Sequence, residues 1–125
     1  MILADTSIWI DHLRSNNKAL GSFLDSERVL IHPFIIGELA LGNLRQRKTV
    51  LVALSDLPSI SMATDAEILH FIDRYELFGR GIGYIDAHLL AAVQFTPGAY
   101  LWTSDNKLHE VADELNLAMK PNRRT

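Results

Sequence analysis

Short apolar runs alternate along this chain with segments that repeat hydrophobic residues at helical spacing. The apolar runs fall at residues 1–4, 28–32 and 99–103, with shorter ones at 59–62 and 117–119. Helical patterns cover residues 6–14, 18–25, 33–44, 49–57, 65–77, 84–95 and the segment after residue 105. Strands that alternate with helices are typical of a parallel sheet whose connections cross over through helices. The pattern therefore predicts an α/β fold with helices on both faces of a parallel sheet.

Several local signals mark where the helices begin. Thr64 and Glu67 have the spacing of a capping box, which predicts a helix that starts at residue 65. Pro33 suits the first turn of a helix, where its missing N–H is not needed. The last helix repeats apolar residues at i, i+3, i+4 and i+7 from Leu108, so one face should pack on the sheet. The glycine-rich segment 79–83 lacks the spacing of a dinucleotide-binding loop and is expected to be a hinge.

The composition limits the size and class of the protein. A chain of 125 residues, 48% of them hydrophobic, is expected to form one domain over residues 1–125. Because it has no cysteine, it cannot use disulfides, a thiol nucleophile or thiolate-bound zinc, and the cytoplasm is the expected location. Asp5 interrupts the first apolar stretch, so no secretion signal is expected. No apolar stretch approaches the roughly 20 residues of a membrane-spanning helix.

Four carboxylates stand inside or at the end of apolar stretches: Asp5, Glu38, Asp86 and Asp105. Such positions normally exclude charge, since an unpaired ionised carboxylate out of water costs on the order of 5 kcal/mol. Glu38 has apolar neighbours and no basic residue three or four positions away. Converging acids repel one another, and a bound cation removes that repulsion. The four positions therefore predict a metal site.

The predicted topology brings the acids to one place. Asp5 and Asp105 follow strands whose carboxyl ends lie at the same edge of a parallel sheet, where α/β folds bind ligands. Glu38 and Asp86 lie near the starts of helices, whose N-terminal dipoles favour carboxylates. Asp5 and Asp105 also suit an ordinary role as helix N-caps, and this alternative stays open for each acid taken singly.

An all-carboxylate site favours a hard divalent ion, Mg²⁺ or Mn²⁺. Calcium is disfavoured because no Asp-rich loop has the spacing of an EF-hand, and the five histidines show no metal-binding spacing. A metal held by carboxylates activates water near neutral pH and neutralises charge on a reacting phosphodiester. Such hydrolysis needs no side-chain nucleophile, and it leaves a 5′-phosphate and a 3′-hydroxyl.

The segments around these acids resemble, in order and spacing, the acidic motifs of PIN-domain ribonucleases. They are Asp-Thr-Ser-Ile-Trp-Ile at 5–10, Gly-Glu-Leu at 37–39, Ile-Asp-Ala-His-Leu-Leu-Ala-Ala at 85–92 and Leu-Trp-Thr-Ser-Asp at 101–105. The resemblance covers nearly the whole chain. The opening hexapeptide and the short length are most similar to VapC-type toxins of toxin–antitoxin pairs. This resemblance implies a three-layer α/β/α sandwich with a central parallel sheet of about five strands.

The resemblance also assigns roles to individual residues. The catalytic metal ligands would be Asp5, Glu38, Asp86 and Asp105. Hydroxyls that orient the carboxylates or water would come from Thr6 or Ser7 and from Thr103. Many family members carry a further acid shortly after the fourth ligand, whereas Asn106 and Lys107 follow it here. This departure argues against a second metal held from that end, and Lys107 is instead a candidate to meet a phosphate.

The net charge of −3 conceals a balance that suits a nucleic-acid partner. When the four candidate ligands are set aside, 15 − 4 leaves 11 acidic residues against 12 basic ones. The basic residues are scattered at 45–48, 74, 80, 107 and 120–124, and either a single RNA-binding rim or separate solvated ends is compatible with the sequence.

The resemblance implies a Mg²⁺- or Mn²⁺-dependent endoribonuclease that acts as a toxin. Its partners would be an RNA substrate, a VapB-type antitoxin and a second copy in a homodimer. The antitoxin arm is expected to cover Trp9, Leu13 and residues 33–44 and to send an arginine to the acids. Unstacked loop bases are the expected RNA feature, although the sequence does not identify the target.

Three alternatives to a toxin stay open. A housekeeping PIN nuclease in RNA maturation or decay would use the same four acids. A receiver or phosphatase-like domain would need an Asp-x-Asp pair, which Asp5 does not begin, or a lysine after the last strand, for which Lys107 is the candidate. A binding module with an acidic pocket that no longer cleaves would have no reason to keep all four acids.

Overall fold

The predicted alternation of strands and helices is present in the computed structural model, which describes residues 1–120. The elements in chain order are β1 (Ile2–Ala4), α1 (Thr6–Ser15), α2 (Lys18–Asp25), β2 (Val29–Leu30), α3 (Pro33–Ala40), α4 (Arg47–Ser55), α5 (Asp65–Arg74), α6 (Tyr84–Gln94), β3 (Tyr100–Trp102) and α7 (Asn106–Glu114). The α/β class with a parallel sheet is therefore confirmed.

The sheet has the strand order β2-β1-β3 and is parallel throughout. In the middle strand, Leu3 pairs with Leu30 on one side and with Leu101 on the other. Every residue of β1 is buried, as expected for a short apolar strand covered on both faces. The Asp5 N–H then donates to the Trp102 carbonyl across 2.9 Å. The carboxyl ends of β1 and β3 consequently lie side by side.

The expectation of about five strands is wrong, because the described residues form a sheet of three. The two predicted edge strands, at 59–62 and 117–119, each make only one parallel bridge. Ser59 pairs with Ile31 in the first, and Ala118 pairs with Leu101 in the second. Pro58 has no N–H with which to lengthen the first pairing. The second segment directly follows the turn that ends α7. Both segments therefore touch the sheet edges at single residues without becoming strands.

Local signals place most helix starts where they were predicted. The capping box of α5 is complete, with Thr64 Oγ1 accepting from the Glu67 N–H at 3.1 Å and Glu67 Oε1 accepting from the Thr64 N–H at 2.8 Å. Pro33 is the first residue of α3. That helix ends at Ala40, before the predicted residue 44, and the Arg47 guanidinium donates to the Ala40 carbonyl at 3.1 and 2.8 Å, which satisfies an acceptor that the helix end leaves free.

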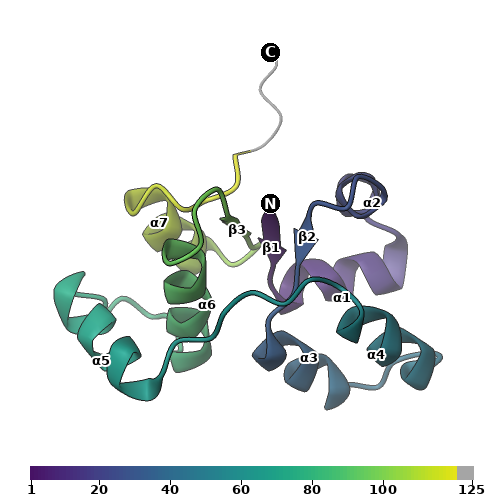
Figure 1. The fold of residues 1–125 in the computed structure, drawn as a ribbon, viewed down its shortest axis with the longest axis horizontal. Helices are drawn as coiled ribbons and strands as arrows, with labels where there is room; N and C mark the ends of the chain where they lie inside the picture. The colour runs from purple at the N-terminus through teal and green to yellow at the C-terminus, as the bar shows by residue number, and fades with distance from the viewer. Residues whose placement is uncertain (121–125) are drawn as a thin grey trace.

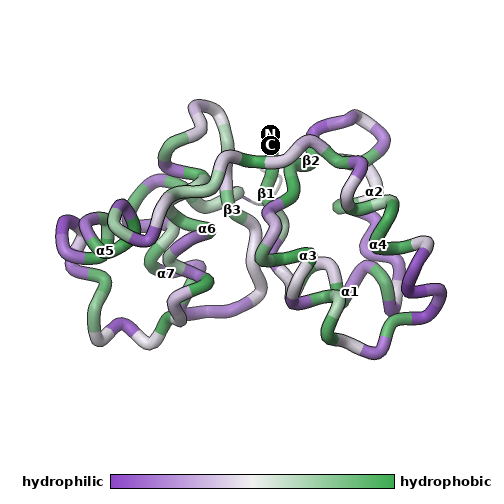
Figure 2. Tube along the Cα trace, turned by 60° about the horizontal axis from the view of Figure 1, so that its bottom comes forward, coloured by the Kyte–Doolittle hydropathy of each residue, from purple (hydrophilic) through white to green (hydrophobic). Residues whose placement is uncertain are grey.

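The helices lie on both sides of the strands. In Figure 1, α5, α6 and α7 lie on one side and α1, α2, α3 and α4 on the other. The trace is hydrophobic through β1 and β2 and hydrophilic at many outer turns (Figure 2). Within residues 1–120, no helix is long and apolar enough to cross a membrane. The assignment of residues 1–125 to a single domain stays a prediction.

Candidate functional site

Asp5 is the buried member of the four predicted acids, with an exposure of 7%. It is the N-cap of α1, and its Oδ1 accepts from the Ile8 N–H at 3.3 Å and from Ser7 Oγ at 2.5 Å. Its Oδ2 accepts from Thr103 Oγ1, which reaches across from the end of β3. The capping alternative is therefore confirmed for Asp5. Two of the predicted hydroxyls also hold this carboxylate in place.

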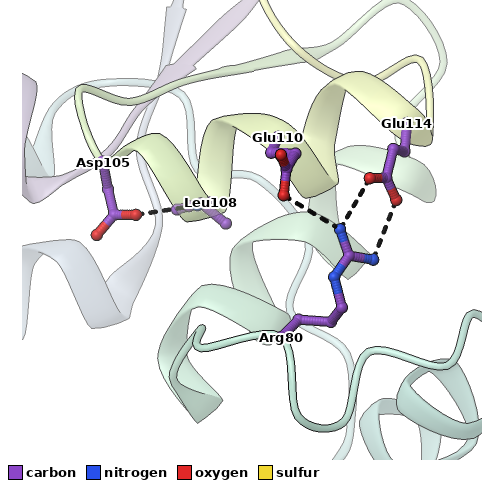
Figure 3. A network of polar contacts seen from close by, with 5 residues as sticks. All are labelled: Arg80, Asp105, Leu108, Glu110 and Glu114. Atoms are coloured by element: carbon purple, nitrogen blue, oxygen red, sulfur yellow. Dashed lines mark hydrogen bonds and ion pairs between the residues drawn. The ribbon is translucent and has the colours of Figure 1, made fainter.

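Asp105 lies next to Asp5 at the same edge of the sheet but is exposed. It is the N-cap of α7, with Oδ1 accepting from the Leu108 N–H at 2.9 Å (Figure 3). Its own N–H donates to Thr103 Oγ1 at 3.0 Å. Thr103 thus links the two acids: its hydroxyl donates to one carboxylate and accepts from the backbone of the other.

Glu38 is exposed, which corrects the expectation of a charge buried among apolar neighbours. Ile35 and Leu39 form the buried face of α3, and Glu38 lies about 100° away from Leu39 on the helix surface. Thr6 Oγ1, in the first residue of α1, donates to Glu38 Oε1 at 2.5 Å. The predicted hydroxyl contact at Thr6 is therefore to Glu38, and it joins α1 to α3.

Asp86 is half-buried in the first turn of α6, where its Oδ2 accepts from the Gly83 N–H at 3.0 Å. Burial raises the pKa of the Asp86 carboxyl above its ordinary value, and the Gly83 hydrogen bond opposes that rise. The negative charges of Asp105, Asp5 and Glu38 raise the pKa further. The structure therefore brings the other three predicted acids within electrostatic range of Asp86.

These acids are not gathered into a ready set of ligands. Over residues 1–120, no three acids or histidines are close enough together to hold a metal ion as they stand. Their oxygens instead accept from hydroxyls and backbone N–H groups, as described above. Each ionised carboxylate has roughly four lone-pair sites, so these bonds leave acceptor capacity on every acid. The role of the four acids as metal ligands stays a prediction.

The segment 79–83 is tied to α7 by side chains that the sequence analysis did not connect. Arg80 donates to both Glu114 oxygens, at 3.0 and 2.8 Å, and lies 3.7 Å from Glu110 (Figure 3). Gly81 has φ +81°, and a Cβ there would lie 2.8 Å from the Lys107 side chain. Glycine adopts this φ readily, and the interpretation of the segment as a hinge stays a prediction. The glycines marked the segment in the sequence, but no sequence signal pointed to its contacts with α7.

Two of the five histidines lie in the core beside the start of α6. His32 and His88 are 0% and 1% exposed. His32 Nδ1 accepts from the Phe34 N–H at 3.0 Å and so caps α3. His32 Nε2 and both ring nitrogens of His88 have no hydrogen-bond partner among the described residues. Burial, together with the smaller effect of the charge of nearby His88, lowers the pKa of His32 to about 4.

The scattered basic residues are partly committed to contacts within the protein. Arg47 binds a carbonyl, Arg80 binds two glutamates, Arg74 lies over the Tyr75 ring and Lys120 pairs with an aspartate. Residues 121–124, counted among the basic tail, lie outside the described residues. A single RNA-binding rim built from all the basic clusters is therefore not supported, whereas Lys107 makes no ion pair within residues 1–120.

Comparison with known proteins gives three findings. The sequence profile of the PIN domain family matches residues 2–114. The chain is 42% identical over 119 residues to Ribonuclease VapC32 of Mycobacterium tuberculosis, in strains CDC 1551 / Oshkosh and ATCC 25618 / H37Rv, covering 95% of this chain and 96% of the relative. The crystal structure of PAE2754 from Pyrobaculum aerophilum superposes with a TM-score of 0.65, covering 94% of this chain and 87% of that one. At 17% identity, this last likeness concerns the fold alone.

Proposed function

The chain belongs to the PIN-domain family, and on that premise we propose that it is a metal-dependent endoribonuclease, the toxin of a toxin–antitoxin pair. Family membership removes the receiver or phosphatase-like alternative. The likeness to Ribonuclease VapC32 extends over nearly the full length of both chains and supports ribonuclease activity. The observation that carries the proposal is the placement of the four acids: Asp5 and Asp105 follow neighbouring parallel strands at one edge of the sheet, Thr6 joins Glu38 to the same helix start, and Asp86 lies near all three. Burial raises the pKa of Asp86, and the charges of Asp105, Asp5 and Glu38 raise it further.

The residues present fit a hard divalent cation. The donors are carboxylate oxygens, which Mg²⁺ and Mn²⁺ prefer. The charges around Asp86 disfavour its ionised form, and a cation between the acids would reverse that effect. Asp5, Glu38, Asp86 and Asp105 would hold the ion. When bound, the ion would lower the pKa of a water molecule and neutralise negative charge on the phosphodiester.

The surrounding residues of the chain position the four acids. Thr103 and Ser7 hold the two oxygens of Asp5, so that this carboxylate keeps one orientation. Thr6 holds one oxygen of Glu38, and the Gly83 N–H holds one oxygen of Asp86. A site fixed in this way loses little side-chain freedom when RNA binds. The chain has no cysteine, and the attacking oxygen comes from water and not from the RNA 2′-hydroxyl. We expect the bond from phosphorus to the 3′-oxygen to break, so that water adds to the phosphate and the products are a 5′-phosphate and a 3′-hydroxyl.

The experiment that tests this function exposes total RNA to the purified protein with and without Mn²⁺ and maps the new 5′ ends. We expect new ends that carry 5′-phosphates in the presence of Mn²⁺ and none in EDTA. The Asp86→Asn variant should give no new ends under either condition. Cleavage that persists in EDTA, or that leaves 2′,3′-cyclic phosphates, would contradict the mechanism.

The partner proposal rests on a hollow beside Glu38. It has a volume of about 720 Å³, and its lining includes the apolar side chains Ile10, Leu13, Leu44 and Val50. Trp9 is 3% exposed, so it does not contribute the surface expected of it. An amphipathic antitoxin arm would cover the apolar lining and send an arginine to the carboxylates. Removal of that arginine should restore cleavage while much of the binding remains.

A homodimer and a cytoplasmic location belong to the same proposal. A chain of 14.0 kDa gains a longer surface for RNA by pairing with a second copy. The absence of cysteine is compatible with a reducing compartment.

A further inference from the structure

A groove of about 420 Å³ lies between α5 and the end of α6. Gln94 and Phe95 line it from the α6 side. The lining from α5 and its C-cap consists of Ala66, Glu67, His70, Phe71, Arg74 and Tyr75. Asp86 is in the first turn of α6 and Gln94 is its last residue, so the groove lies at the far end of this helix from the carboxylates. In Figure 1 and in Figure 2, α6 lies between α5 and the strands, which makes α5 an outer helix.

The groove has an aromatic floor. Phe71 is buried, and its ring centroid lies 5.0 Å from that of Tyr75 and 6.2 Å from that of Phe95. Phe95 is 53% exposed, although it packs against this buried ring. An apolar surface with aromatic residues at its centre and polar groups around it is typical of a protein contact site. The groove is therefore a candidate interface.

One acid and one base of the groove are available to a partner. Arg74 is exposed, lies over the Tyr75 ring at 5.6 Å and makes no ion pair within residues 1–120. Glu67 is also exposed; its Oε1 accepts from the Thr64 N–H at 2.8 Å, and it makes no ion pair within the same part of the chain. The two residues are seven positions apart, so they lie on the same side of α5, about two turns from each other.

The groove residues of α5 are complementary to a second copy of themselves. They form three pairs that share one midpoint, between residues 70 and 71. The pairs are Glu67 with Arg74, Ala66 with Tyr75, and His70 with Phe71. When two α5 helices pack antiparallel about a two-fold axis at this midpoint, each residue lies opposite its pair member in the other copy. The acid then meets the base at both ends of the contact, and the smallest side chain, Ala66, meets the large Tyr75.

We propose that two copies of the chain pair through this groove, with their α5 helices antiparallel and with Glu67 of each copy bound to Arg74 of the other. This inference rests on the homodimer included in the proposed function, and it assigns the interface. The carboxylate sites of both copies lie at the other ends of their α6 helices, so this pairing leaves them open to RNA. By symmetry, each single substitution acts twice in the dimer.

The direct test is sedimentation of variants whose groove charges are reversed. The wild type should give about twice 14.0 kDa. Glu67→Arg and Arg74→Glu each place like charges opposite one another at both ends of the contact, so each should weaken self-association at least tenfold. An equimolar mixture of these two variants should dimerise, because one copy then carries only bases at the two positions and the other only acids. The double variant Glu67→Arg/Arg74→Glu should dimerise by itself.

Two matched controls separate this interface from the folding of α5. Thr64→Ala removes the hydroxyl of the capping box that includes Glu67 but keeps both groove charges, so it should dimerise like the wild type. Leu69 is 60% exposed on α5 but does not line the groove, so Leu69→Arg should also dimerise like the wild type. Far-UV circular dichroism of each variant verifies that it is folded.

Cross-linking tests the register, because the chain has no cysteine of its own. A short bis-maleimide should join two copies of the His70→Cys variant across the two-fold axis and leave the Leu69→Cys variant monomeric on a denaturing gel. Wild-type dimer affinity in both charge-reversed variants would overturn this interface while keeping the homodimer, and so would a mixture of the two that stays monomeric. A monomeric wild type would overturn both the interface and the homodimer. Cleavage of RNA with Mn²⁺ decides on the ribonuclease function separately from either result.

Discussion

Replacing Asp5 by alanine and by asparagine should separate the stability that this residue supplies from the activity proposed for it. Alanine removes the N-cap bond to Ile8, worth about 1 kcal/mol. It also removes bonds from Ser7 and Thr103 to a buried charge, worth about 1.5 to 3 kcal/mol each. Relief of repulsion from the other acids offsets part of this loss. We expect Asp5→Ala to lower the free energy of unfolding of the metal-free protein by about 3 kcal/mol.

Asparagine has nearly the same shape and caps helices about as well as aspartate. Asp5→Asn should therefore unfold within about 1 kcal/mol of the wild type. Both variants should fail to cleave RNA, because neither carries the charge at this position. Urea unfolding in EDTA at neutral pH measures the free energy of unfolding. The variants can be compared if the slope of this free energy against urea concentration is the same in each. Asn17→Ala removes the N-cap bond to Leu20 in α2 and serves as a matched control, with a loss of about 1 kcal/mol and full cleavage.

Two results would refute this reasoning. If Asp5→Asn and Asp5→Ala lost equal stability, hydrogen bonding at this position would not account for the cost. If Asp5→Asn cleaved RNA at the wild-type rate, the charge would have no part in the reaction.

Three further predictions concern the buried His32, the ion pair of Arg80 with Glu114 and the oligomeric state. Because the pKa of His32 is about 4 in the fold against an ordinary 6.5, the unfolded chain takes up its proton first, and the free energy of unfolding should fall by up to about 3 kcal/mol as pH drops from 6.5 towards 4. In His32→Asn, the urea midpoint of unfolding should change less with pH over that range. An equal pH dependence in this variant and in the wild type would contradict the assignment to His32. Arg80→Ala should reduce cleavage several-fold by releasing the segment before Asp86 from Glu114, and Arg80→Lys should restore part of it. Full activity in Arg80→Ala would exclude a positioning role. Sedimentation at micromolar concentration should give about twice 14.0 kDa, and a strict monomer would contradict the proposed homodimer.

Much of the fold could be predicted because its signals are local. The capping box at Thr64 and Glu67 and the proline at the start of α3 depend on neighbours within a few residues. The buried stripe of α7, which includes Leu108 and Val111, follows from helical spacing alone. Asp5 and Asp105 were placed correctly at one edge because parallel strands must end together.

The remaining features depend on contacts between distant residues, which spacing does not encode. The carbonyl at the early end of α3 is satisfied by a guanidinium seven positions further on, at Arg47. The missing strands at residues 59 and 118 reflect how far each segment runs beside the sheet before it turns away. Glu38 was expected in the core because its neighbours are apolar, but the burial of Ile35 and Leu39 leaves it on the outer face. The contact of Arg80 with Glu114 spans 34 positions and left no trace in the sequence pattern.

The central claim is that the acids of four separate segments share one cation. The most direct measurement is Mn²⁺ binding by electron paramagnetic resonance, in the wild type and in the Asp5→Asn, Glu38→Gln, Asp86→Asn and Asp105→Asn variants. We predict that the wild type binds Mn²⁺ and that each of the four substitutions weakens binding at least tenfold, since each removes one charge from a single site. Thr96→Val, which alters a hydroxyl bonded to Ala92 in α6, should bind Mn²⁺ like the wild type. Wild-type Mn²⁺ affinity in the Asp86→Asn or Glu38→Gln variant would contradict the claim.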